Sequence, residues 1–122
     1  MKLMLPLTLT ALLFAGQALA AECTAPTNDT SVPNGSKATK EQMIAAQRAV
    51  KAYDTAVKEY GECLKTAQEA ELAAAGDKLT DDMRVKIVSK YADRSNAEVD
   101  KLQKMADKFN AELKAFKAKN PA

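Results

Sequence analysis

The side chains that could carry chemistry are few and scattered. The chain has no His, which removes the commonest general base and the commonest metal ligand. Its two cysteines, Cys23 and Cys63, lack the CxxC spacing of a thioredoxin-type dithiol or a structural zinc site. Carboxylate pairs such as Glu59 and Glu62 fit the solvated outer face of a helix better than acid–base catalysis. We therefore expect no enzymatic activity, no catalytic residue, no cofactor and no metal site.

The cysteines are more informative as a pair. In an exported chain of this size, two cysteines predict one intramolecular disulfide, Cys23–Cys63. Closing a loop of about 40 residues stabilises a fold by about 4 kcal/mol in the chain-entropy model. The alternative is a lipid on Cys23. Bacterial lipoproteins need a small residue before that cysteine, whereas this chain has Glu22, and lipidation would leave Cys63 as a lone thiol.

Three tyrosines form the other notable set. Tyr53 and Tyr60 are seven residues apart, on one face of an expected helix, and Tyr91 falls on the apolar stripe of a second helix. We regard them as a possible interaction face for a sugar or an aromatic ligand, although such rows more often fill the space between helices. Soft-metal binding by methionine is a further alternative, but helix packing suits dispersed methionines better. These are Met43, Met83 and Met105.

The first 20 residues have the features of a secretory signal peptide. Lys2 supplies the positive region, an apolar run follows, and Ala18-Leu19-Ala20 is a small-x-small cleavage site. A membrane anchor is the alternative, but the apolar run is short for a span. We expect a mature chain that starts at Ala21, forms one small domain without an integral membrane segment, and is periplasmic or secreted.

Residues 39–75 form the element that positions the rest. Apolar side chains recur at steps of three, four and seven residues, which is the pattern of a long amphipathic helix and close to a coiled-coil heptad. Thr39 and Gln42 have the spacing of a capping box, and Gly76 suits the helix end. Before the helix, residues 21–38 are rich in Pro, Gly, Asn and Ser and predict an extended arm. The stripe of this helix comprises Met43, Ala46, Val50, Tyr53, Val57, Tyr60, Leu64 and Ala67.

A second helix is predicted over residues 81–118, after a turn at residues 76–80, with Thr80 as its N-cap. A link this short makes two long helices antiparallel neighbours. The predicted fold class is therefore all-α, a long antiparallel two-helix hairpin over residues 39–119 with an extended N-terminal arm held by a disulfide. The stripe of the second helix comprises Val88, Tyr91, Ala92, Val99, Leu102, Met105, Ala106, Phe109, Leu113 and Phe116.

Charge and packing restrict the partners. The chain is nearly neutral, with 18 basic and 16 acidic residues, and an acidic excess before residue 78 complements a basic excess after it. This balance does not suit a nucleic-acid binder. A two-helix hairpin has a thin core, and Ile44, Val85 and Ile87 lie off both stripes. We expect them to complete the core near the helix ends, or to contact a second copy in a four-helix homodimer.

One set of residues runs through the arm and the first helix: Cys23, Pro26, Pro33-Asn34-Gly35, Ala38-Thr39, Gln42-Met43, Ala46-Gln47, Val50-Lys51, Tyr53, Tyr60 and Cys63-Leu64. This set resembles a pattern in small exported proteobacterial proteins of no assigned activity, which commonly have Asp where Asn34 stands. It covers about a third of the chain. The resemblance implies a bacterial, periplasmic, disulfide-containing helical protein, and it implies no catalytic or binding residue.

Taken together, these features favour a non-enzymatic structural or protein-interaction module of the bacterial envelope that acts through a helix face. Its partner would be a second copy or another envelope protein. One alternative is a carrier of a small ligand or metal. Another is a weak binder of anionic lipid, or of another envelope component, through the basic second helix.

Overall fold

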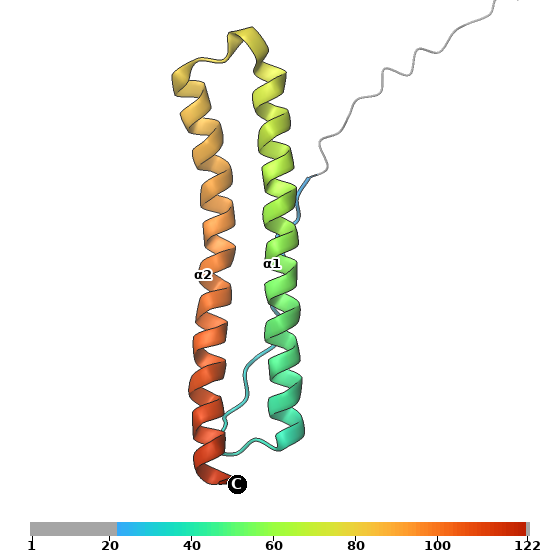
Figure 1. The fold of residues 1–122 in the computed structure, drawn as a ribbon, viewed down its shortest axis with the longest axis vertical. Helices are drawn as coiled ribbons and strands as arrows, with labels where there is room; N and C mark the ends of the chain where they lie inside the picture. Colours follow the sequence, from blue (N-terminus) through green and yellow to red (C-terminus); the bar gives the residue numbers. More distant parts are fainter. Residues whose placement is uncertain (1–21, 122) are drawn as a thin grey trace, which may run out of the picture.

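The chain folds into a long helical hairpin with an extended segment running beside it (Figure 1). The structure is a computed structural model and describes residues 22–121. The predicted signal peptide, residues 1–20, lies outside the described residues. Helix α1 spans Lys40–Ala75, the short 3-10 turn η1 spans Gly76–Lys78, and α2 spans Asp81–Lys119. No strand occurs within residues 22–121, and the predicted all-α antiparallel hairpin is confirmed.

The ends of α1 are fixed by the residues that the sequence indicated. The Thr39 hydroxyl accepts a hydrogen bond from the Gln42 backbone N–H at 3.1 Å, and the Gln42 side chain accepts one from the Thr39 N–H at 2.8 Å. This reciprocal capping box satisfies two N–H groups that have no partner inside the helix. At the other end Gly76 has φ +50°. Because side chains disfavour this conformation, the glycine lets the chain leave the helix without strain.

Helix α2 starts and ends with favourable charges. The Thr80 hydroxyl accepts a hydrogen bond from the Met83 N–H at 3.1 Å. Two aspartates occupy the first turn of α2 and Lys117 and Lys119 occupy its last turn. Acidic groups near a helix N-terminus and basic groups near its C-terminus complement the helix dipole.

The arm, residues 22–39, runs back along α1 and is fixed at both of its ends (Figure 1). At its start, the predicted Cys23–Cys63 disulfide is present, with 5.7 Å between the two Cα atoms. At its far end, the Gly35 N–H donates a hydrogen bond to the Glu112 carboxylate on α2. The backbone of Gly35 also lies directly against the backbone of α2. A Cβ atom at this position would lie 1.7 Å from the Glu112 carbonyl oxygen, so only glycine fits.

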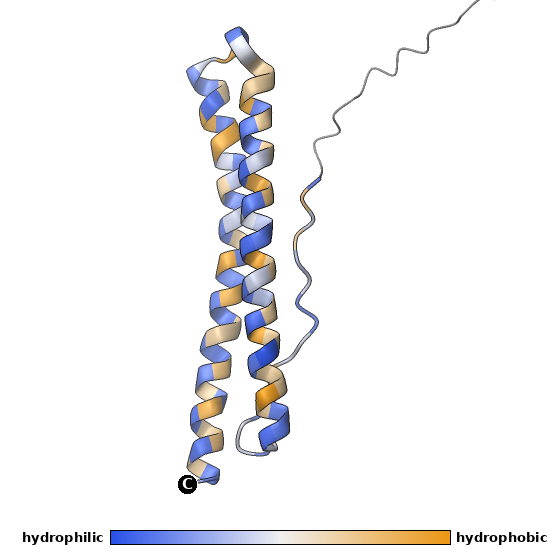
Figure 2. Cartoon of the chain, turned by 45° about the vertical axis from the view of Figure 1, so that its right-hand side comes forward, coloured by the Kyte–Doolittle hydropathy of each residue, from blue (hydrophilic) through white to orange (hydrophobic). Residues whose placement is uncertain are grey.

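Buried side chains are concentrated in the part of the hairpin that the arm covers. Two apolar clusters lie there, and the hydropathy colouring shows apolar residues along both helices (Figure 2). Towards the turn that joins the helices, none of residues 65–97 is buried. The core therefore ends well before the helices do. The first cluster comprises Val32, Met43, Ala46, Tyr53, Val57, Met105 and Phe109, and the second comprises Cys23, Tyr60 and Leu64.

The predicted stripe of α1 is buried or half-buried at every position, but the predicted stripe of α2 is wrong at three. Val88 and Val99 are 39% and 44% exposed, and Ala92 is also exposed. Helix α2 is turned so that Glu98, which the predicted stripe did not include, faces α1 together with Tyr91 and Met105, which it did. The reason is that polar side chains in this seam are satisfied by partners on α1 and can therefore be buried. Within residues 22–121, no helix is both long and apolar enough to cross a membrane.

Candidate functional site

A buried carboxylate lies in the seam between the helices. Glu98 is only 4% exposed. Its two oxygens accept hydrogen bonds from the Tyr53 hydroxyl at 2.8 Å and from the Lys101 ammonium at 2.9 Å. Burial alone would raise the pKa of Glu98, but the hydrogen bonds from Lys101 and Tyr53 and the charge of Lys101 lower it below its usual value. Burial and the bond to Glu98 raise the pKa of Tyr53 to about 12. Both groups stay fixed in one protonation state near neutral pH, which suits packing better than proton transfer.

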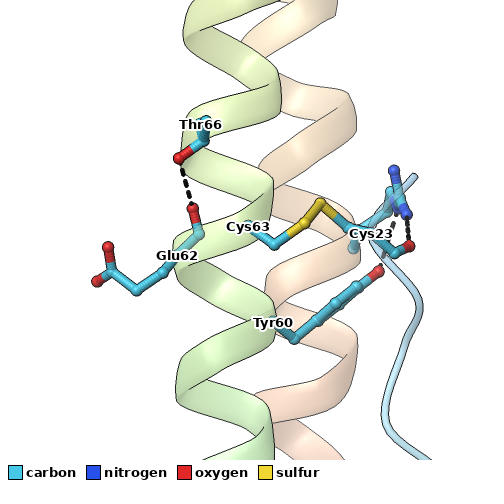
Figure 3. The surroundings of a disulfide bond; sticks show 6 residues. Cys23, Tyr60, Glu62, Cys63 and Thr66 are labelled. Atoms are coloured by element: carbon cyan, nitrogen blue, oxygen red, sulfur yellow. Dashed lines mark hydrogen bonds between the residues drawn. A yellow bond between two sulfur atoms is a disulfide. The ribbon is translucent and has the colours of Figure 1, made fainter. Parts of the chain in front are cut away.

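Arg94 joins all three segments beside the disulfide. Its guanidinium donates to the Tyr60 hydroxyl at 3.2 Å and to the Cys23 carbonyl oxygen at 2.9 Å. Figure 3 shows Tyr60 beside the Cys23–Cys63 disulfide. It also lies 5.8 Å from the Tyr60 ring centroid, within the range of a cation–π contact. One side chain of α2 therefore holds α1 and the start of the arm together, next to the covalent Cys23–Cys63 link.

A third tyrosine contact lies nearer the turn. The Tyr91 hydroxyl donates to Glu71 at 2.7 Å, and the Lys90 ammonium donates to the same carboxylate at 2.8 Å. The hydrogen bond from Lys90, and to a smaller extent that from Tyr91, lower the pKa of Glu71. The same bond to Glu71 raises the pKa of Tyr91. Glu71 and Lys90 are open to solvent, so water screens this group far more than it screens Glu98.

The three tyrosines predicted as a possible interaction face therefore lie in the seam of the hairpin. Tyr53 and Tyr60 are 5% and 7% exposed, and Tyr91 is half-buried. A ligand could reach little more than their edges. Sequence reasoning missed their charged partners. The available signal was the spacing of Arg94 and Glu98, two charged residues that follow the period of the α2 stripe. A search for apolar residues alone leaves them out.

The arm creates a groove along one long face of the hairpin, which we call the basic groove. It has a volume of about 660 Å³. Three lysines of α2 line it: Lys101, Lys104 and Lys108. Within residues 22–121, Lys101 is the one of the three with a carboxylate partner, Glu98. One acidic residue of the arm, Asp29, also lines it. The full lining is Pro26, Thr27, Asn28, Asp29, Thr30, Ser31, Val32, Tyr53, Lys101, Lys104, Met105 and Lys108.

The opposite long face, which we call the bare face, is not covered by the arm. On the side that the arm covers, arm residues and residues of α1 such as Ala56, Glu59 and Cys63 line the same groove. A shallow hollow of about 180 Å³ lies between the helices on the other side, and no arm residue lines it. Its lining is Gly61, Leu64, Lys65, Gln68, Tyr91, Ala92 and Ser95.

A row of small and apolar residues on α2 forms the edge of the bare face, and we call it the valine stripe. It comprises Val85, Val88, Ala92, Ser95, Val99, Leu102 and Ala106, at alternating steps of three and four residues. Val85, Val88 and Val99 are 63%, 39% and 44% exposed. The next row outward has a seven-residue repeat and is polar without charge: Ser89, Asn96, Gln103 and Asn110. The charged residues of the same helical segment all lie outside these two rows.

The three methionines considered for metal binding are divided between the core and the surface. Met43 and Met105 belong to the first buried cluster, while Met83 is 39% exposed. In the part of the chain that the structure describes, no three His, Cys, Asp or Glu side chains gather as a metal site would require. Comparison with protein-family models, with curated proteins and with solved structures finds no significant match to this chain.

Proposed function

We propose that this protein is a non-enzymatic interaction module of the bacterial envelope, and that it acts through the bare face. On this proposal the predicted signal peptide exports the chain, and the Cys23–Cys63 disulfide forms in the periplasm. The disulfide then holds the arm against one face of the hairpin and leaves the other available for a partner.

The valine stripe is the observation that carries this proposal. Single exposed apolar residues are ordinary on protein surfaces, but a continuous uncharged row on a highly charged helix is not. Val85, Val88 and Val99 keep one side of α2 exposed in its first half. The buried tyrosines and Glu98, by contrast, have their polar groups satisfied inside the fold and offer little to a partner.

The test is cross-linking in cells that produce the protein, with two variants. The stripe variant carries Val88→Glu and Val99→Glu. The control variant carries Ala97→Glu and Ala111→Glu, which add the same charge at exposed positions of α2 that project away from the stripe. We expect wild type and the control variant to give the same cross-linked species and the stripe variant to lose them. Identical species from all three proteins would refute action through this face.

A second candidate function is favoured by the basic groove, which could attract an anionic lipid headgroup or a small anion. Lys104 and Lys108 line it, and neither pairs with a carboxylate of the described part of the chain. The wild-type protein should then co-sediment with vesicles that contain phosphatidylglycerol at low salt. At high salt it should stay in the supernatant, because the attraction is electrostatic. Changing Lys104 and Lys108 to Gln should weaken binding more than the same changes at Lys86 and Lys114, which do not line the groove. Equal effects would exclude a specific role for the groove.

A further inference from the structure

We propose that the partner of the bare face is a second copy of this chain, with the valine stripe of one α2 against the valine stripe of the other about a two-fold axis. This inference rests on the proposed function and names the partner for it. The spacing of the stripe and its lack of charge support the proposal, and its size sets the expected strength of the contact.

The spacing is that of a helix-to-helix contact. Steps of three and four residues keep one row facing a partner helix over many turns when the two helices wrap around each other. Within the stripe, Val85, Ala92, Val99 and Ala106 repeat every seven residues and alternate between a larger and a smaller side chain. Alternating sizes let two such rows interdigitate. Ser95, Leu102 and Ala106 are half-buried, and Leu102 packs against the core, so the stripe borders the row that packs on α1. Its outer members, Val85, Val88, Ala92 and Val99, remain exposed.

The absence of charge makes the stripe complementary to itself. In a two-fold dimer the same patch is present on both sides, so a patch that carries one sign of charge faces the same sign on its copy, whereas an uncharged patch does not. The two rows that form the edge of the bare face contain no charged residue, so they can meet in either relative direction without like-charge repulsion. The basic groove could not do this, because Lys101, Lys104 and Lys108 would approach the same lysines of the partner. A charged lipid or polymer, conversely, would find nothing to pair with on the stripe.

The size of the stripe predicts a reversible dimer. From Val85 to Ala106 the helix rises about 32 Å, and a band one helix diameter wide over this length covers about 300 Å² on each copy. A standard stable interface buries about 800 Å² of accessible surface on each partner. The contact should therefore depend on protein concentration and be lost on dilution.

Sedimentation of the purified, oxidised protein over a range of concentrations tests the proposal. We expect the wild-type mass to rise towards twice the monomer mass as concentration increases. The control variant should behave like wild type. The stripe variant should stay monomeric, with a dissociation constant raised by at least about 100-fold, because its glutamates would meet across the two-fold axis. Since Val88 and Val99 are already exposed in the monomer, the stripe variant should keep the wild-type helical content by circular dichroism.

A mixing experiment separates a stripe-to-stripe contact from any other dimer. A third protein carries Val88→Lys and Val99→Lys and should also be monomeric alone. Mixed with the stripe variant, it should form a heterodimer, because opposite charges then face each other whichever way the helices run. A mixture that stays monomeric, or wild type that stays monomeric at every concentration, would overturn self-association.

The failure of this inference can be told apart from that of the proposed function. If wild type is monomeric but cells show cross-links to a different protein that the stripe variant loses, the second copy is refuted and the bare face still has a partner. If the three proteins give the same cross-links in cells, the proposed function itself fails.

Discussion

Replacing Tyr53 by Phe removes one hydroxyl and nothing else, and it tests the buried pair in the seam. In the folded protein this hydroxyl donates at 2.8 Å to a carboxylate that is 4% exposed. A hydrogen bond to a charged group contributes about 1.5–3 kcal/mol, and a buried charge that loses a donor cannot recover it from water. We therefore expect Tyr53→Phe to lower the free energy of unfolding by about 2 kcal/mol. For a domain of this size that lowers the Tm by roughly 10 °C.

The assay is denaturant unfolding followed by far-UV circular dichroism, with Tyr91→Phe as the matched control. Tyr91 also donates to a carboxylate, Glu71, at 2.7 Å, but that carboxylate is solvated. Its loss should change stability much less, because water replaces the hydroxyl. A Tyr53→Phe change no larger than that of Tyr91→Phe would refute the reasoning that burial decides the strength of these contacts.

The pH dependence gives a second check on the same pair. The pKa of Glu98 is lower in the folded state than its unfolded value of about 4.3, so its contribution is present above that pH. That contribution is lost as the pH falls through the folded pKa. The stability difference between wild type and Tyr53→Phe should therefore shrink in acid, since a neutral acceptor makes the weaker hydrogen bond. A difference that is constant from neutral to strongly acidic pH would mean that the charge of Glu98 plays no part.

Three further predictions concern the arm and the alkaline limit. Changing Cys23 and Cys63 together to Ser should lower the free energy of unfolding by about 4 kcal/mol, because 40 residues separate them, and limited proteolysis should then cut the arm first. An unchanged digest would mean that the arm is held without the disulfide. Gly35→Ala should displace the arm from Glu112 and lower the free energy of unfolding by about 2 kcal/mol. Gly61→Ala, with open space around it, should leave that free energy unchanged or raise it. Equal effects of the two changes would refute the close approach of Gly35 to α2. Because the folded pKa of Tyr53 is about 12 and its unfolded value about 10, its contribution is complete below pH 10 and is lost as the pH rises towards 12. The stability difference between wild type and Tyr53→Phe should therefore shrink as the pH rises from about 10 towards 12, and a difference that stays constant over that range would contradict this.

The hairpin could be predicted from the sequence because its determinants are local. A capping box needs only Thr39 and Gln42, three residues apart, and both of its hydrogen bonds are present. The stripe of α1 follows from the period of its apolar side chains. The disulfide needed no geometry at all, since two cysteines allow one pairing.

The orientation of α2 could not be predicted in the same way. A charged residue at a stripe position reads as an interruption, yet Glu98 is buried because Tyr53, 45 residues away, satisfies it. Once Glu98 and Arg94 face α1, Val88 and Val99 must turn outward. The path of the arm along α1 follows from the predicted disulfide, but its contact with α2 was equally hidden, since Gly35 is held by a residue 77 positions later. The candidate site depends on the orientation of α2 and on the contact between the arm and α2. Its residues could therefore be read from the sequence, but their roles could not be predicted.

The uneven distribution of buried side chains along the rod has a consequence for its motion. Residues 65–97 contain no buried side chain, whereas the arm-covered part contains the whole core. Local opening costs least where few apolar contacts must be broken. The rod should therefore have a gradient of opening free energy, with amide exchange fastest around η1 and slowest near the disulfide. A partner bound over Val85 and Val88 would contact the end of the rod where local opening costs least. Its binding should therefore slow amide exchange most in the turn that joins the helices.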